Sequence, residues 1–163
     1  MPRPSGLTPR GAKQKGDTYE RDLAKYFNEH VFGGRDQVQR AVLSGGGRWR
    51  KTDANVEYAG DADLEGTPHL FVEAKRTERF ALHDTMRQLT RNATAVRPGA
   101  IPVAITRRNS QPLAKSYCVL HLEDFVHLYR ALLLAIDRAD RQYANHRIAK
   151  SGDPSDPTPD PVF

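Results

Sequence analysis

The chain has 163 residues, of which 28% are charged and 38% are hydrophobic, and its formal net charge is +5 at pH 7. These values are typical of one soluble globular domain, and the excess of lysine and arginine favours a polyanionic partner. The single cysteine, Cys118, excludes an intramolecular disulfide and a cysteine-based zinc site. No apolar segment has the length of a signal-peptide core or a membrane span, so we expect a cytoplasmic protein.

The two ends of the chain differ in composition from the rest. Residues 1–16 are rich in Pro, Gly, Lys and Arg and lack apolar periodicity, which predicts a flexible basic arm. Residues 151–163 are acidic and proline-rich, which predicts a disordered tail. We therefore expect one folded domain over residues 17–150.

Between the ends, apolar periodicity and turn residues predict the element order α-β-β-β-α-β-β-α. The first helix is expected to begin at Asp17 as N-cap and to end at Gly33-Gly34. The other expected elements are strands over 38–43, 62–65 and 69–74, a helix over 82–95, strands over 101–106 and 117–122, and a helix over 123–147. Cys118 lies in an apolar run and is expected to be buried. The alternation indicates the α/β or α+β class, with a mixed central sheet flanked by helices.

Charged residues close the apolar strand expected over 69–74. Glu73 and Lys75 are two residues apart, and alternate residues of a strand project to the same face. The strand therefore delivers a carboxylate and an ammonium group to one face at its end.

Two aspartates precede this strand, and the geometry of the turn brings them near it. If the turn centres on Thr67, Asp61 lies opposite Glu73 and Asp63 lies opposite Phe71. Both aspartates then share a sheet face with the charges at the strand end, an arrangement that the fold alone does not need. Asp61 and Asp63 compete as the metal ligand, and the spacing to Glu73 and the following Leu64 favour Asp63. Asp61 would then support a ligand from outside, or be a plain turn residue after a glycine.

Carboxylates beside a lysine suit the hydrolysis of a phosphodiester. Asp and Glu oxygens hold Mg²⁺, a hard cation that polarises the phosphoryl group and lowers the pKa of bound water. A neighbouring lysine orients the attacking water or helps to deprotonate it, and it stabilises the negative charge of the transition state. Repulsion between the carboxylates disfavours the empty site, and a cation relieves that repulsion.

The pattern Asp63-x₉-Glu73-x-Lys75 resembles the PD-(D/E)xK nuclease superfamily, with Ala62 in place of the usual proline. Residues 15–23 are similar to the opening of archaeal Holliday-junction resolvases. The resemblance implies a restriction-endonuclease-like αβββαβ core with an extra C-terminal strand and a long helix. It also implies that the folded domain is a nuclease that uses Mg²⁺, with Mn²⁺ as a substitute.

Other segments extend the resemblance. Glu20 matches the helical glutamate that joins the metal site of those resolvases, although it also fits a capping box with Asp17. Residues 39–45 are similar to their arginine strand and Ser-Gly loop, and the helix with Gln88 is similar to their glutamine helix. The resemblance implies the catalytic residues Asp63, Glu73, Lys75 and Glu20, and the metal ligands Asp63, Glu73, Glu20 and Asp61. It implies DNA contacts from Arg21, Arg40, Ser44 and Gln88. Arg48, Arg50 and Lys51 follow a glycine-rich loop and Arg76 adjoins the active-site strand, so their cations suit phosphate contacts, although a solvated basic surface fits them as well.

The resemblance implies a Mg²⁺-dependent endodeoxyribonuclease that cleaves branched DNA, as a Holliday-junction resolvase does in recombination and repair, in a prokaryotic cell or a virus-infected host. A homodimer is expected because two active sites cut two strands symmetrically, and the apolar final helix is expected to be core or a dimer contact. The alternatives are a nicking, flap-cutting or restriction-type PD-(D/E)xK endonuclease and a non-catalytic DNA-binding protein. The acidic pair disfavours the last, because it would repel phosphate without a cation.

Overall fold

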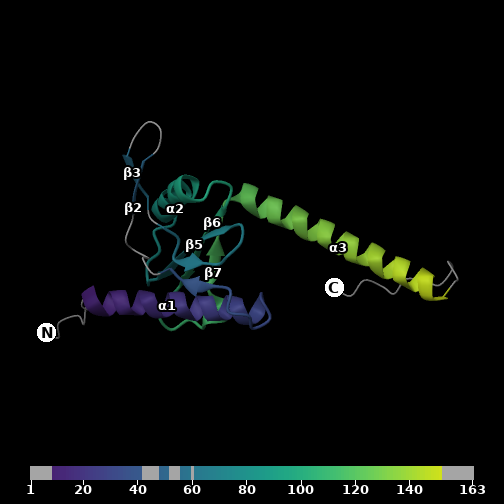
Figure 1. The fold of residues 1–163 in the computed structure, drawn as a ribbon. Helices are drawn as coiled ribbons and strands as arrows, with labels where there is room; N and C mark the ends of the chain where they lie inside the picture. The colour runs from purple at the N-terminus through teal and green to yellow at the C-terminus, as the bar shows by residue number, and fades with distance from the viewer. Residues whose placement is uncertain (1–8, 42–47, 52–55, 60, 152–163) are drawn as a thin grey trace. The chain divides into compact units, whose positions relative to one another are not determined.

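The computed structural model describes residues 9–41, 48–51, 56–59 and 61–151, and the chain divides into two units, Met1–His121 and Leu122–Phe163 (Figure 1). The first unit contains α1 (Pro9–His30), β1 (Gln39–Arg40), β2 (Arg48–Lys51), β3 (Val56–Ala59), β4 (Leu64–Glu65), β5 (Leu70–Arg76), α2 (Leu82–Val96), β6 (Ile101–Arg107), the 3-10 turn η1 (Leu113–Lys115) and β7 (Tyr117–Val119). The second unit contains α3 (Leu122–Ser151). In the part of the chain that the structure describes, no helix is both apolar and long enough to pass through a bilayer.

The predicted mixed sheet is confirmed. β5 and β6 pair in parallel, with Leu70 opposite Ile101, and β7 pairs antiparallel with β6 at the edge. Parallel neighbours need a crossover connection, and α2 supplies it between β5 and β6. β1 and β4 form an antiparallel pair, and the Asp63 N–H, which donates to the Val72 carbonyl, joins this pair to β5. The element order without the β2–β3 hairpin is the predicted one.

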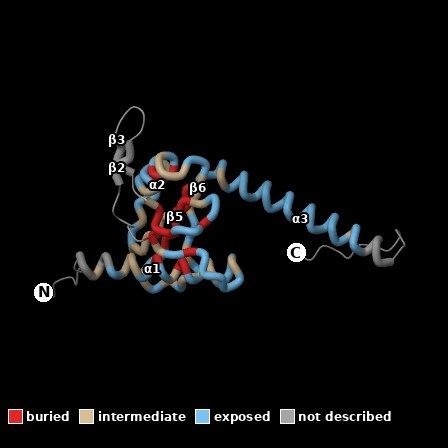
Figure 2. The backbone as a smooth tube through the Cα atoms, in the orientation of Figure 1, coloured by how far each residue is buried: buried red, intermediate tan, exposed pale blue. Residues whose placement is uncertain are grey.

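Helices cover both faces of the β5–β6 pair, and buried residues lie between them (Figure 2). One apolar cluster joins α1 to β5 and β6 through residues that include Tyr19, Leu23, Val72, Ala74, Val103 and Ile105. The other joins α2 to the same strands through Phe71, Met86, Leu89, Ala93 and Ala104. Successive residues of β5 thus point to opposite faces, as strand geometry requires.

The sequence predicts the C-terminal end of α1 but not its start. The helix begins at Pro9, so the prediction that Asp17 is its N-cap is wrong, and residues 9–16 are helical. A proline is tolerated in the first turn of a helix because the N–H that it lacks has no partner there. The predicted end is confirmed: Gly33 and Gly34 have φ values of 62° and 83°, and the Gly34 N–H donates to the Asn28 carbonyl at 2.8 Å.

Three further expectations differ from the structure. The strand expected over 38–43 contains only Gln39–Arg40 within the described residues, and residues 42–47 lie outside them. The polar segment before residue 60 contains the β2–β3 hairpin. Cys118 is exposed rather than buried, because it lies on the edge strand β7.

The apolar residues of α3 are exposed, contrary to the expectation that they form core. Leu132 and Leu134 are each 54% exposed, and Ile136 is 49% exposed. α3 is the one element of the second unit among its described residues. Its apolar side chains therefore have no second element to pack against within that unit.

Candidate active site

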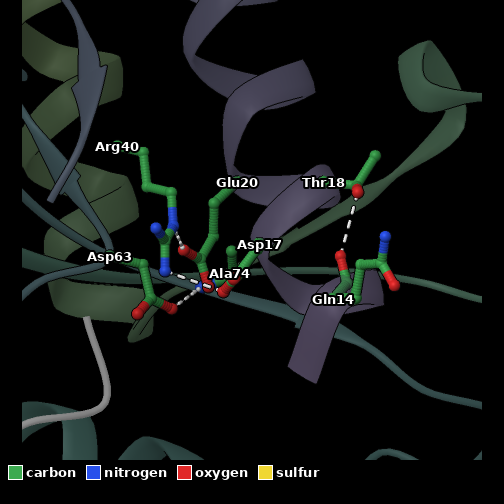
Figure 3. A network of polar contacts seen from close by, with 7 residues as sticks. All are labelled: Gln14, Asp17, Thr18, Glu20, Arg40, Asp63 and Ala74. Carbon is green, nitrogen blue, oxygen red and sulfur yellow. Dashed lines mark hydrogen bonds and ion pairs between the residues drawn. The ribbon is translucent and has the colours of Figure 1, made fainter. Parts of the chain in front are cut away.

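Asp63 is held in place by its own backbone and by the neighbouring strand. Its N–H donates to the Val72 carbonyl at 2.8 Å, and its carbonyl accepts the Ala41 N–H at 2.9 Å. Its Oδ2 atom accepts the Ala74 N–H at 2.7 Å, as Figure 3 shows. Only 8% of the residue is exposed, so the carboxylate has a fixed position inside the unit.

The predicted register between the strands on either side of the turn, over residues 62–65 and 69–74, is wrong by one residue. Asp63 bonds to Val72 instead of facing Phe71, and no continuous ladder joins β4 to β5 within the described ranges. In the connection between β4 and β5, Gly66 and His69 both adopt positive φ, at 79° and 62°. A sequence pattern does not reveal the left-handed conformation of a histidine.

The predicted convergence of Asp63 and Glu73 is nevertheless present. The pKa of Asp63 is raised to about 7, first by burial and then by the negative charges of Glu73 and Glu20. The Ala74 N–H and the positive charge of Lys75 act in the opposite direction. Asp63 therefore lies close enough to two other carboxylates for their charges to resist its ionisation.

Lys75 and Glu73 share a face of β5, as predicted, and form an ion pair. Burial alone would lower the pKa of Lys75, but the charges of Glu73, Asp63 and Glu20 raise it above its ordinary value. The lysine is therefore an ammonium ion at neutral pH. In this form it can donate hydrogen bonds and offset negative charge, but it cannot accept a proton.

Glu20 reaches the same cluster from α1, together with Asp17, which the sequence reasoning assigned only to helix capping. Arg40 on β1 contacts both: its Nε donates to Glu20 Oε2 at 2.6 Å and its Nη2 donates to Asp17 Oδ1 at 2.7 Å (Figure 3). The hydrogen bond to Glu20 raises the pKa of Arg40 above its ordinary value. Because Asp17 is inside the helix, the capping-box interpretation of Glu20 is wrong. The three-residue spacing of two acids on one helix is the sequence signal that could have indicated Asp17.

Asn28 fixes the point at which the chain enters β1. Its Oδ1 accepts the Val38 N–H at 2.7 Å, and its Nδ2 donates to the Val38 carbonyl at 2.9 Å. A side-chain amide that bonds both backbone groups of one residue acts as a short strand partner. It holds β1, and with it Arg40, against the end of α1.

The charges of the cluster suit a divalent cation. Four carboxylates and two cationic groups leave two net negative charges when all are ionised: Asp17, Glu20, Asp63 and Glu73 against Arg40 and Lys75. Among the described residues, no three Asp, Glu, His or Cys side chains form a ready-made metal cage. Glu20 is paired with Arg40, and Glu73 is paired with Lys75. Carboxylate oxygens with an excess of negative charge nevertheless fit a hard cation such as Mg²⁺.

The remaining predicted site residues lie at various places. Arg21 on α1 and Gln88 on α2 are exposed, and Asp61 is half-buried two residues before Asp63. Arg76 is half-buried, and its Nη2 donates to the Asn109 carbonyl at 3.4 Å. β2 contains Arg48, Arg50 and Lys51, and Ser44 lies outside the described residues. Their proposed contacts with DNA stay predictions.

A model of the family described as "Phage putative PDDEXK endonuclease" matches residues 11–152. The chain belongs to this family. The match includes Asp63, Glu73 and Lys75 as well as α3, so the final helix is part of the family's own sequence. The PD-(D/E)xK superfamily inferred from the sequence is confirmed, and the protein is a PD-(D/E)xK nuclease. Searches of curated proteins and of solved structures return no match.

Proposed function

We propose that this PD-(D/E)xK nuclease is a Mg²⁺-dependent endodeoxyribonuclease that cleaves branched DNA, with the Holliday junction as its main substrate. The observation that carries the proposal is the position of the Asp63 carboxylate, which the Ala74 N–H holds beside the Glu73–Lys75 ion pair. The negative charge of Glu20 also acts on Asp63. Repulsion between these carboxylates lowers the stability of the metal-free fold. A bound cation would offset that repulsion, which explains why the cluster is present.

Asp63 and Glu73 would hold the cation, with help from Glu20 and Asp61. When bound, it supplies Lewis-acid activation of the phosphodiester and lowers the pKa of the attacking water, and Mn²⁺ would substitute for Mg²⁺. The Ala74 N–H orients the carboxylate of Asp63 before any ligand arrives. Lys75, which is protonated, donates to the water or to a phosphate oxygen and offsets the charge of the transition state.

DNA would be held by cationic and polar groups around this cluster. The proposed contacts are Arg21, Arg40, Ser44, Arg48, Arg50, Lys51, Arg76 and Gln88. Arg40 has the best support, because its guanidinium lies against the carboxylate of Glu20, a proposed metal ligand. Phosphate contacts of this kind position the duplex and make its affinity depend on salt.

A homodimer is proposed because resolution of a four-way junction needs two cuts, and α3 offers a surface for a second copy of the chain. Apolar residues follow one another along it in alternating steps of three and four: Leu122, Phe125, Tyr129, Leu132, Ile136, Ala139 and Tyr143. This is the spacing of a two-stranded coiled coil. Every Asp, Glu and Arg between Leu122 and Tyr143 falls outside the series. Two copies would therefore bury matching apolar seams while their charges stay in water.

A panel of DNA substrates tests the proposed specificity. Four-way junction, flap, nicked duplex and plain duplex of the same sequence are each incubated with Mg²⁺, with Mn²⁺ or with EDTA. The proposal expects metal-dependent cleavage that is fastest on the junction, with paired cuts on opposite strands. Equal cleavage of plain duplex would favour a restriction-type nuclease, and cleavage at flap bases would favour a flap nuclease. Salt-sensitive binding without any product would favour a non-catalytic DNA-binding protein.

A further inference from the structure

We infer that Asp17 is a positioning residue, which keeps the guanidinium of Arg40 aimed at the DNA phosphate when Glu20 turns to the metal ion. The inference rests on the proposed nuclease function and adds a residue to it. Asp17 is not among the proposed metal ligands or DNA contacts, and its role would be exerted through Arg40.

Arg40 contacts two carboxylates of α1. Its Nε donates to Glu20 at 2.6 Å and its Nη2 donates to Asp17 at 2.7 Å. Asp17 and Glu20 are three residues apart on α1, so they lie on the same helix face, one turn apart. The guanidinium thus lies across one turn of the helix, with one carboxylate at each contact.

The two carboxylates are not equivalent, because only one of them is needed elsewhere. Glu20 contributes to the electrostatic field at Asp63 and is a proposed metal ligand. If Glu20 contacts the cation, its hydrogen bond to Arg40 is weakened or lost. Asp17 makes no such second contribution to the causes that raise the pKa of Asp63. It can therefore hold Arg40 in both states of the site.

The burial of these side chains gives the contact enough strength for that role. The side chain of Arg40 is 22% exposed and that of Asp17 is 24% exposed. Charge-assisted hydrogen bonds between such half-buried groups are stronger than those of exposed ion pairs, which contribute little. The contact also connects α1 to β1, whose entry is fixed by Asn28. Arg40 is thus held against α1 twice, through its own side chain and through the strand that carries it.

Two simpler roles for Asp17 predict different outcomes. If Asp17 only ties α1 to β1, its loss lowers stability and leaves cleavage by the folded protein unchanged. If it only adds negative charge near the DNA, its loss makes DNA binding tighter, because phosphates are repelled less. A positioning role instead lowers the cleavage rate, and only while Arg40 is present.

A double-mutant cycle distinguishes these roles. Asp17→Asn, Arg40→Gln and the double variant are compared with the wild type by single-turnover cleavage of a four-way junction at saturating Mg²⁺. We expect Asp17→Asn to slow cleavage about 10-fold in the wild-type background and less than about 2-fold in the Arg40→Gln background. The Mn²⁺ affinity of Asp17→Asn, measured by titration, should stay within about 2-fold of the wild type.

Asp22→Asn is the matched control. Asp22 is also an aspartate of α1 that pairs with an arginine, since it lies 3.7 Å from Arg107 Nη2, but it is outside the cluster. The Asp22→Asn variant should cleave the junction at the wild-type rate. Equal losses from Asp17→Asn in both backgrounds, or cleavage at the wild-type rate or faster, would overturn the inference. A wild-type protein that cuts no DNA would instead overturn the proposed function, so the two failures are distinguishable.

Discussion

The carboxylate of Asp63 accepts the backbone N–H of Ala74 at 2.7 Å, which places it between Glu73 and Lys75 along β5. One hydrogen bond thus links the acidic residue before the turn to the strand that carries the other two charges. It also orients the carboxylate in a buried position, where its ionisation is opposed by burial and by Glu73. Ionisation of Asp63 in this position lowers the stability of the metal-free protein, and this loss of stability can be measured.

Asp63→Asn should stabilise the metal-free protein at alkaline pH. The pKa of Asp63 rises from 3.8 to about 7 in the fold, so the folded state holds the proton more tightly than the unfolded state does. Stability contributed by this group is complete below pH 3.8 and is lost as the pH rises to 7. Asparagine stays neutral, and its Oδ1 can still accept the Ala74 N–H. At pH 8 in EDTA we expect its Tm to exceed that of the wild type by about 5 °C.

The control for this measurement is Asp84→Asn, an exposed aspartate of α2. Its Tm should follow that of the wild type at every pH. Added Mg²⁺ should raise the Tm of the wild type but not that of Asp63→Asn. A lower Tm for Asp63→Asn than for the wild type at pH 8 without metal would refute the electrostatic account of Asp63.

Lys75→Gln should slow cleavage and shift its pH dependence. In the wild type, protons compete with the cation for Asp63, so the half-saturating Mg²⁺ concentration should rise about 10-fold per pH unit below 7. Lys75 lowers the pKa of Asp63, so its replacement should move this rise to higher pH. The rate at saturating Mg²⁺ should fall about 100-fold, because a charge that stabilises the transition state is lost. Lys25→Gln, at an exposed position of α1, should change neither quantity. An unshifted Mg²⁺ profile for Lys75→Gln would show that Lys75 does not act on Asp63.

Gly66→Ala should destabilise the protein at the turn that precedes β5. Gly66 has a φ of +79°, and a Cβ atom there would lie 1.9 Å from the Gln37 carbonyl oxygen, which belongs to the backbone and cannot rotate away. We expect a loss of about 3 kcal/mol in the free energy of unfolding, measured with urea. Gly99→Ala is the matched control: its φ is +83°, but a Cβ would meet nothing within 4 Å. It should cost about 1 kcal/mol, and equal losses at both positions would contradict the close packing at Gly66.

Leu132→Glu should convert the proposed homodimer to a monomer. Leu132 lies in the heptad series of α3, whereas Leu134 lies outside it, and both residues are 54% exposed. A charge in the seam would be buried in the dimer, while a charge at Leu134 would stay in water. Light scattering coupled to size exclusion should therefore give a monomer mass for Leu132→Glu and a dimer mass for Leu134→Glu. A monomeric wild type, or equal effects of both variants, would refute the seam.

The sequence predicts the helices and strands of this fold well where the apolar pattern is strong. The helix expected over 82–95 is α2, and the strand expected over 101–106 is β6, because Met86, Leu89 and Ala93 alternate with exposed residues and β6 is continuously buried. The start of α1 could not be predicted, since residues 9–16 have no apolar face. The register of Asp63 was missed because a sequence pattern does not fix the backbone conformation of the connection to β5, in which His69 has a positive φ.

The site shows the same division. Asp63, Glu73 and Lys75 could be predicted because a spacing motif marks them, and the structure brings them together with Glu20. Asp17 was missed because its importance comes from Arg40, which is 23 residues away in sequence and contacts it only in the fold. The spacing of Asp17 and Glu20 marks two acids on one helix face, but the contact with Arg40 joins two elements and has no local signal in a single sequence.

The most direct test of the account is the Mg²⁺-dependent cleavage rate of Glu73→Gln on a four-way junction, with Glu29→Gln as control. Glu29 is an exposed glutamate of α1 that pairs with Lys25, outside the cluster. The account predicts that Glu73→Gln binds the junction within about 3-fold of the wild type but cleaves it at least about 100-fold more slowly. Glu29→Gln should cleave at the wild-type rate. Cleavage by Glu73→Gln at the wild-type rate would contradict the assignment of the active site.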